Sequence, residues 1–423
     1  MSKQQVISII GALVVGIVLG STFLYFFAPS ILPRQVEYVE VSKLPKEIPI
    51  GLIVDLSGFL SSYGKREQKA AQLAIEDINN FVKAIGLNTT FVLYVEDNQA
   101  KADKALAAVQ SLASRGVKVI IGPMSSGAVT TVKTFADSNK IIIFSHTSTA
   151  VSLAIPNDYV FRAVPTDAIQ GKAIATLLKT LGIKKAAVIY LGETWGEGLF
   201  TGFKEEFEKN GGEVVGIAVD PQATDISPEV RKLSDTVKQL GVGPETAILT
   251  FLYEQAVQAL ALAREDPVLK SVRWFGCDGT AGSQRIINET GDVAVQVGGF
   301  LSTVFNPTDS PKKEEFRNRY VERFNEEPDP YSYNTYDAVW TVALAILSVG
   351  EYDSEKIAKA LPIVAEKYFG VSGWMRLDEN GDRASGDYII LGVVYENGKY
   401  VWKEVAVYKE STGEIVWKTE VGG

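Results

Sequence analysis

The chain has 423 residues, of which 46% are hydrophobic and 22% charged, and its formal net charge is -9. This length exceeds the size at which a single hydrophobic core usually stops growing, so we expect more than one domain. The negative charge and the lack of a basic cluster argue against a nucleic-acid partner, because phosphate backbones are bound by clustered Lys and Arg. A single Cys, Cys277, and a single His, His146, exclude an internal disulfide and a zinc site of usual composition, and we expect no metal and no cofactor.

The N-terminal segment predicts a membrane anchor. Residues 6–28 carry no charge, and a helix of this length, at about 1.5 Å per residue, can cross a hydrocarbon core of roughly 30 Å. Signal-peptide cores are shorter, so we expect residues 1–28 to be an uncleaved transmembrane helix, with a cleaved signal as the alternative. Lys3 weakly favours an inside N-terminus and therefore a body on the extracytoplasmic side of the cell membrane. Residues 29–47 contain three prolines among mixed charges and are expected to form an extended stalk.

The body of the chain alternates short β-branched segments with longer amphipathic ones. Apolar segments without strict alternation are typical of parallel strands that helices cover on both faces. Two successive series predict two doubly wound α/β domains. In the first series we expect strands at residues 48–54, 91–95, 118–121 and 141–144, and helices at 63–85, 101–115 and 128–138. In the second we expect strands at 186–190, 213–219, 247–251 and 272–275, and helices at 170–181, 197–209, 228–240 and 256–264.

The last segment, residues 388–417, has a different pattern. Its apolar residues alternate as in antiparallel strands, and the pair Asn397-Gly398 predicts a hairpin turn.

Ligands of open α/β sheets bind beyond the carboxyl ends of the strands, where helix N-termini offer free N–H groups. In the first half of the chain three such loops are rich in Ser and Thr, at residues 57–64, 122–127 and 145–149. Hydroxyls and helix N-termini suit a carboxylate or another compact anion. For a single loop, ordinary helix capping explains the same residues, but three loops in one half favour a binding cleft.

The corresponding loops of the second half are of another kind. Trp195 lies among glycines in the loop at 192–198, Tyr253 follows a strand, and Asp278 lies in a tight turn. An aspartate can neutralise an ammonium group, and aromatic rings can enclose an apolar side chain. The alternative for Asp278 is a turn or capping role.

Several of these segments together resemble a known family. The segments are Gly51-Leu52-Ile53-Val54-Asp55-Leu56-Ser57-Gly58, Tyr63-Gly64, Gly122-Pro123-Met124-Ser125-Ser126, Trp195-Gly196-Glu197-Gly198 and Gly276-Cys277-Asp278-Gly279. In their order and spacing, residues 48 to 417 resemble the type I periplasmic binding proteins of the leucine/isoleucine/valine-binding class.

The resemblance implies a ligand-binding role for seven residues. Ser126 matches the position whose hydroxyl and amide hold the ligand α-carboxylate. Thr147 matches one whose carbonyl takes the α-ammonium, and Thr149 one that touches both groups. Asp278 lies where the family has a Glu that counters the ammonium, and its shorter side chain puts direct contact in question. Tyr63 and Trp195 match aromatic residues that close over the ligand.

The seventh residue is Tyr253. Its match to the family is uncertain by one residue, since Leu252 fits the same position equally well. Asp167 falls where the chain crosses between the lobes.

The fold implied by the resemblance has two lobes joined by a hinge of three segments. One lobe is expected at residues 48–166 plus 303–383, and the other at 167–302 plus 384–423. The implied function is to capture a small molecule, by family default a branched-chain amino acid, by lobe closure, and to deliver it to an ABC permease with its ATPase.

Two alternatives remain open. A membrane-anchored sensor of the same fold would bind an amide, urea or a small organic acid. An amide-cleaving enzyme is the least favoured, because His146 is the only available base and no Gly-x-Ser-x-Gly segment accompanies it. We therefore expect no catalytic residues and no enzymatic activity.

Overall fold

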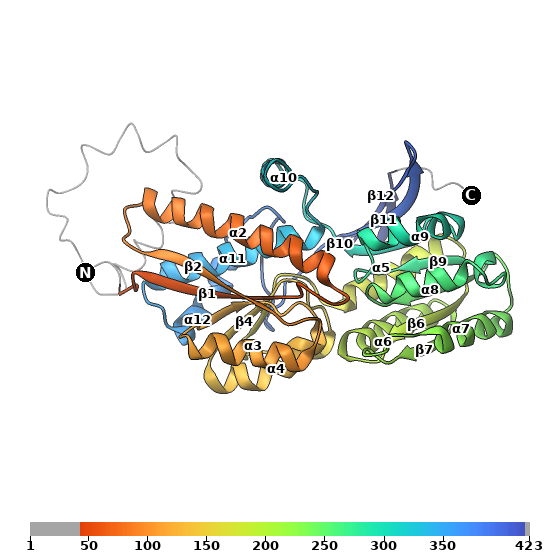
Figure 1. Cartoon of the computed structure of the whole chain (residues 1–423), viewed down its shortest axis with the longest axis horizontal. Coiled ribbons are helices and arrows are strands. Elements are labelled where there is room, and N and C mark those ends of the chain that lie inside the picture. Colours follow the sequence, from red (N-terminus) through yellow and green to blue (C-terminus); the bar gives the residue numbers. More distant parts are fainter. Residues whose placement is uncertain (1–42, 419–423) are drawn as a thin grey trace.

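The computed structural model describes residues 43–418, so the predicted anchor over residues 1–28 and most of the predicted stalk lie outside the described part of the chain. Among residues 43–418 no helix is both long and apolar enough to cross a membrane. Two helix-covered sheets lie next to each other along the long axis of the molecule (Figure 1).

The first sheet is parallel throughout and has the strand order β2-β1-β3-β4-β5. Its central strands are apolar on both faces, as expected for a sheet between two helical layers. We call this sheet and its helices the first lobe. Its strands are β1 (Glu47–Val54), β2 (Thr90–Asp97), β3 (Val119–Ile121), β4 (Ile142–Ser145) and β5 (Val160–Arg162). Its helices are α2 (Ser61–Ala84), α3 (Ala102–Ser114), α4 (Ser126–Asn139), α10 (Pro311–Phe324), α11 (Pro330–Val349) and α12 (Ser354–Ala365), with the short 3₁₀ turn η2 (Val151–Leu153).

The second sheet has the order β13-β12-β11-β10-β9-β8-β6-β7, parallel from β7 to β10 and antiparallel from there to β13. We call this sheet and its helices the second lobe. Its strands are β6 (Lys185–Leu191), β7 (Glu213–Val219), β8 (Thr246–Phe251), β9 (Arg273–Gly276), β10 (Leu301–Phe305), β11 (Tyr388–Glu396), β12 (Lys399–Lys409) and β13 (Glu414–Trp417). Its helices are α5 (Asp167–Thr180), α6 (Thr194–Lys209), α7 (Ser227–Leu240), α8 (Gln255–Ala263) and α9 (Gln284–Gln296), with the 3₁₀ turn η3 (Leu269–Ser271).

The predicted hairpin is confirmed. β11 and β12 pair up to Glu396 and Lys399, and the two residues between them have φ values of 51° (Asn397) and 80° (Gly398). Positive φ at both central residues is the geometry for which Asn-Gly is favoured.

The chain passes between the lobes three times, after β5, after β10 and before β11. β10 pairs with β9 and β11 in the second sheet. The boundary between the lobes that the sequence predicts, at residue 302, falls within this strand. The lobe boundaries drawn from the sequence themselves stay a prediction.

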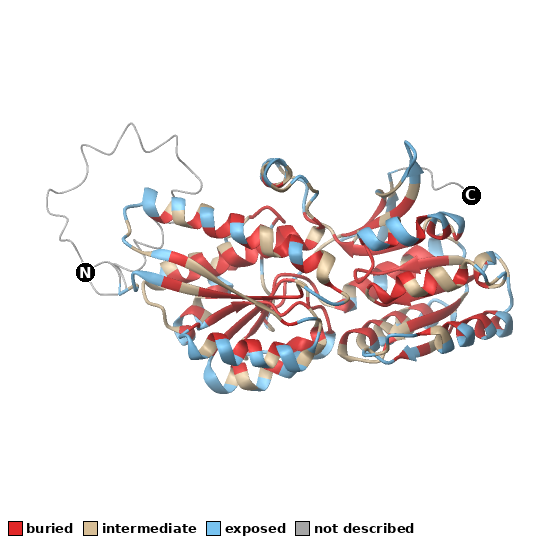
Figure 2. Ribbon diagram, viewed as in Figure 1, coloured by how far each residue is buried: buried red, intermediate tan, exposed pale blue. Residues whose placement is uncertain are grey.

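Buried residues follow the strands and the helix faces that contact them, while exposed residues lie on the outer helix faces (Figure 2). One glycine in each lobe lets a helix approach a strand end closely. A Cβ on Gly64 of α2 would lie 2.2 Å from the Asp55 carbonyl oxygen, and one on Gly196 of α6 would lie 2.1 Å from that of Leu191. An aromatic residue, Tyr63 or Trp195, precedes each glycine, so this close packing places both rings at strand ends.

Candidate ligand-binding site

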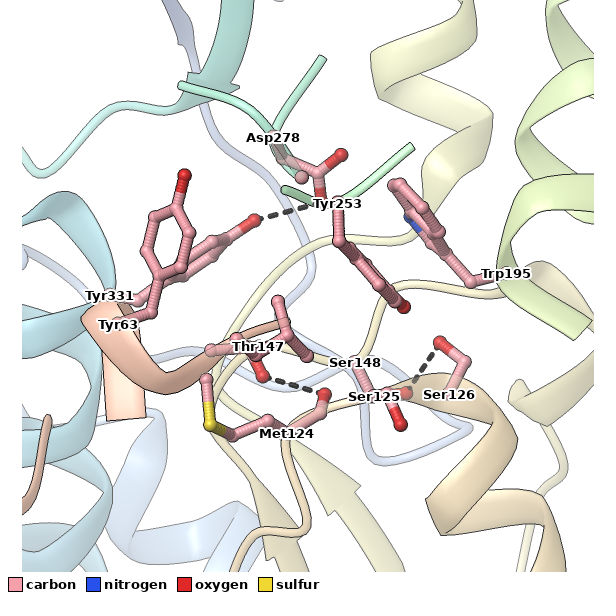
Figure 3. A pocket seen from close by; sticks show the side chains of 12 residues that line it. Tyr63, Met124, Ser125, Ser126, Thr147, Ser148, Trp195, Tyr253, Asp278 and Tyr331 are labelled. Atoms are coloured by element: carbon pink, nitrogen blue, oxygen red, sulfur yellow. Dashed lines mark hydrogen bonds between the residues drawn. The ribbon is translucent and has the colours of Figure 1, made fainter. Parts of the chain in front are cut away.

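A pocket lies between the two lobes, beyond the carboxyl ends of β1, β3, β4, β6, β8 and β9 (Figure 3). The space between its lining atoms is about 380 Å³, part of which is open to solvent. Both lobes contribute side chains, so a ligand held here would contact both. The lining residues are Leu60, Tyr63, Met124, Ser125, Ser126, Thr147, Ser148, Trp195, Tyr253, Asp278, Gly279 and Tyr331.

Hydroxyl groups form one side of the pocket, at the start of α4. The Ser125 hydroxyl accepts a hydrogen bond from the Ala128 N–H at 3.3 Å and caps the helix. The Ser126 hydroxyl lies 2.9 Å from that of Ser148 and accepts from the N–H of Thr149 at 3.3 Å. Ser126 therefore ties the loop after β3 to the loop after β4. The positive end of the α4 dipole and these hydroxyls form an environment suited to a carboxylate.

Thr147 and Thr149 occupy different places. Thr147 lines the pocket, and its hydroxyl donates to the Met124 carbonyl at 2.6 Å. Thr149 is buried but does not line the pocket. Its side chain lies near Asp167, whose charged form it helps to stabilise.

Aromatic rings enclose the pocket. Trp195 and Tyr253 stack with ring centroids 4.5 Å apart and planes inclined by 11° (Figure 3). Tyr253 lines the pocket, whereas Leu252 is packed in the core of the second lobe. Tyr63 faces this pair from the first lobe, and its hydroxyl donates to the Ala281 carbonyl of the second lobe.

Asp278 is the carboxylate of the pocket. The Tyr331 hydroxyl donates to its Oδ2 at 2.9 Å, and its Oδ1 makes no hydrogen bond within the described residues. Burial raises the pKa of Asp278 to about 6, while the Tyr331 hydrogen bond acts in the opposite direction. Burial and the nearby charge of Asp278 raise the pKa of Asp167 well above its usual range. Asp278 in the pocket and Asp167, which does not line it, are thus close enough for their charges to repel, and a positively charged group would relieve this repulsion.

The structure brings together six of the seven residues expected from the sequence, and Thr149 lies behind them. The additional lining residues Leu60, Met124, Ser125, Ser148 and Gly279 belong to the strand-end loops already singled out. Tyr331 does not, because it lies in the first turn of α11, and no sequence signal marked it. His146 does not line the pocket and lies 2.8 Å from the Glu67 carboxylate in the core of the first lobe.

Comparison with known proteins agrees with this architecture. Residues 66–396 match the family model of the receptor family ligand binding region. An uncharacterised protein of Methanocaldococcus jannaschii is 38% identical over 391 residues, covering 88% of this chain and 92% of that protein. Leu/Ile/Val-binding protein homolog 3 of Brucella melitensis is 26% identical, covering 85% and 94%. The crystal structure of the leucine-binding protein LivK of Thermotoga maritima covers 88% of this chain and 99% of its own, with a TM-score of 0.73 at 22% identity.

The resemblance seen in the sequence is confirmed by these matches, and the Brucella and Thermotoga relatives are named as binding proteins, not as enzymes. The match of the family model to most of the described chain shows that this protein belongs to the family of receptor ligand-binding regions and has the type I periplasmic binding protein fold.

Proposed function

We propose that this protein is an extracytoplasmic solute-binding receptor that captures an amino acid, by preference a branched-chain one, between its lobes. The proposal depends above all on the chemistry at the two sides of one pocket. Hydroxyls and the α4 N-terminus lie on one side, and the buried Asp278 with a free carboxylate oxygen lies on the other. A zwitterion would satisfy both, its carboxylate at Ser126 and its ammonium at Asp278.

The remaining walls suit an apolar side chain. Leu60, Met124 and the stacked pair of Trp195 and Tyr253 offer carbon surface. The names of the Brucella melitensis and Thermotoga maritima relatives, which are a Leu/Ile/Val-binding protein homolog and a leucine-binding protein, support a branched-chain ligand.

The partner and the location complete the proposal. An ABC permease with its ATPase would receive the ligand from the closed receptor, and this chain would make or break no bond. The apolar segment at residues 1–28 would tether the receptor to the cell membrane, with the stalk and the two lobes on the extracytoplasmic side.

The test is a binding series that varies one charged group at a time. Leucine, isoleucine and valine are compared with 4-methylpentanoate, which lacks the ammonium, and with isoamylamine, which lacks the carboxylate. We expect leucine, isoleucine or valine to raise the melting temperature of the detergent-solubilised full chain, since a ligand at 100 times its Kd adds about 2.7 kcal/mol to stability. Both single-charge analogues should bind far more weakly. Binding of 4-methylpentanoate without binding of any amino acid would refute the zwitterion site and favour an organic acid.

A further inference from the structure

Two carboxylates of the second lobe reach residues of the first lobe without lining the pocket. Glu193 lies between β6 and α6, and Glu254 lies between β8 and α8. Each therefore follows a strand of the second sheet, as the pocket residues Trp195 and Tyr253 do.

Glu193 lies at the N-termini of two helices from opposite lobes. Its side chain accepts a hydrogen bond from the Gly196 N–H at 3.3 Å and caps α6 in its own lobe. A Cβ built on Gly127, in the first turn of α4, would lie 2.8 Å from its Oε2. Burial raises the pKa of Glu193, and the N–H groups of Trp195, Gly196 and Gly127 all favour its charged form. Two helix dipoles thus stabilise one carboxylate, and one of them is available only when the lobes are in contact.

Glu254 also contacts the first lobe, at the start of α2. It is 2% exposed, and its Oε1 accepts from the hydroxyl of Ser62 in the first lobe at 2.8 Å. In its own lobe the same oxygen accepts from the Ser283 hydroxyl at 3.1 Å, and Arg285 lies 3.6 Å from Oε2. The charge of Glu254 is therefore balanced within the second lobe, and Ser62 adds a bond that separation of the lobes would break.

We propose that Glu193 and Glu254 are latch residues that favour the closed arrangement of the lobes and so set ligand affinity without touching the ligand. Interactions that exist in only one of two conformations shift the equilibrium towards it by their full differential free energy. A ligand that binds only between closed lobes is then held more tightly in proportion to the closed population. This inference rests on the proposed function only in its assumption that closure captures the ligand.

The latch at Glu193 explains the glycine opposite it. Any side chain at position 127 would displace the Glu193 carboxylate, because its Cβ would lie within 2.8 Å of Oε2. Gly127→Ala therefore tests the contribution of Glu193 to closure without disturbing the fold. Alanine is the better helix former, so the substitution should not lower the melting temperature, yet it should weaken closure. Gly198→Ala in α6 is the matched control, because a Cβ there meets no atom within 4 Å.

The experiment measures lobe separation directly in the full chain. Spin labels are attached to cysteines introduced as Lys104→Cys on α3 and Lys232→Cys on α7, both exposed, while the native Cys277 is buried. Distance distributions are recorded without added solute for the parent, Gly127→Ala, Glu193→Gln and Ser62→Ala, with Gly198→Ala and Glu205→Gln, an exposed position of α6, as controls. We expect the three latch variants, and neither control, to move population to longer distances.

Leucine dissociation, measured in the same set, should become faster by about three- to tenfold in each latch variant. Distance distributions identical to the parent in all three latch variants would refute the latches. The distances are measured without ligand, so they test the latches independently of the proposed amino-acid ligand. That ligand proposal is instead refuted if leucine does not bind the parent.

Discussion

The hydroxyl of Tyr63 in the first lobe donates a 3.1 Å hydrogen bond to the carbonyl oxygen of Ala281 in the second lobe. The ring also lines the pocket, so one side chain both forms part of the pocket wall and joins the two lobes. Tyr63→Phe keeps the ring and removes the bond. We expect leucine to bind about fivefold more weakly in this variant, since a neutral hydrogen bond contributes about 1 kcal/mol. Calorimetric titration measures the change, and Tyr190→Phe, which alters a ring stacked on Phe200 within the second lobe, is the control. Equal affinities of parent and Tyr63→Phe would show that this bond does not favour closure.

Asp278→Asn should remove the partner of the ligand ammonium. The loss of a buried charge partner is expected to weaken leucine binding by about 2–5 kcal/mol, whereas 4-methylpentanoate should bind no worse than to the parent. Competition titration against both compounds tests the assignment. If the two compounds lose affinity equally, Asp278 supports the pocket rather than the ammonium.

The pKa of about 6 at Asp278 gives leucine binding a definite pH dependence. An ammonium group pairs with the ionised carboxylate, so binding should release a proton near pH 6. Affinity should be constant above about pH 7 and fall below pH 6 by up to about tenfold per unit. Titrations between pH 5 and 8 measure the slope, which Asp278→Asn should reduce. A flat profile in the parent would mean that Asp278 is already ionised when the ligand arrives.

Asp55, buried at the end of β1, should make stability decrease as pH rises. Its pKa is raised to about 7, chiefly by burial and against the hydrogen bond that the Ala100 N–H donates at 2.6 Å. The folded state therefore keeps a proton that the unfolded chain loses near pH 4. This contribution to stability is complete below about pH 4 and is lost as pH rises through about 7.

Between pH 5 and 8 the free energy of unfolding of the parent should therefore fall by about 2 kcal/mol more than that of Asp55→Asn. Urea unfolding at several pH values tests this, with Asp103→Asn on the exposed face of α3 as the control. Parallel pH profiles for the parent and Asp55→Asn would contradict the prediction.

Gly64→Ala tests how tightly α2 packs on β1. The added Cβ would lie 2.2 Å from the Asp55 carbonyl oxygen, so the helix must shift. We expect a loss of about 1–3 kcal/mol of stability, measurable by urea unfolding. Gly198→Ala, where space is open, should cost nothing, and an equally stable Gly64→Ala would show that the helix moves freely.

Much of the architecture could be predicted because its signals are local. Apolar strands, amphipathic helices and the Asn397-Gly398 turn each depend on neighbouring residues, and the structure has them within a few positions of their predicted bounds. The strand-end rule then identified the loops that line the pocket, since parallel strands bring their carboxyl ends to one edge.

The details of the site depend on contacts between distant segments. Local pattern could not decide between Leu252 and Tyr253, because which of two consecutive side chains faces the cleft depends on the neighbouring lobe. Thr149 lies in a predicted loop, but its side chain turns towards Asp167. Tyr331 enters the pocket only because α11 packs on α2, a contact between segments more than 200 residues apart in sequence.

The packing of α11 on α2 also has a consequence for biosynthesis. The five strands of the first sheet have left the ribosome once Arg162 has emerged, but α11 begins only at Pro330. In between, the nascent chain contains most of the second lobe, while α2 can pack on β1 and β2 but lacks its partner helix α11. The first lobe therefore cannot be completed until most of the second lobe has been synthesised, and the second lobe in turn waits for β11 to β13 at the end of the chain. Such long-range closure slows folding and exposes apolar surface to aggregation, so this receptor should depend on chaperones until translation is nearly complete.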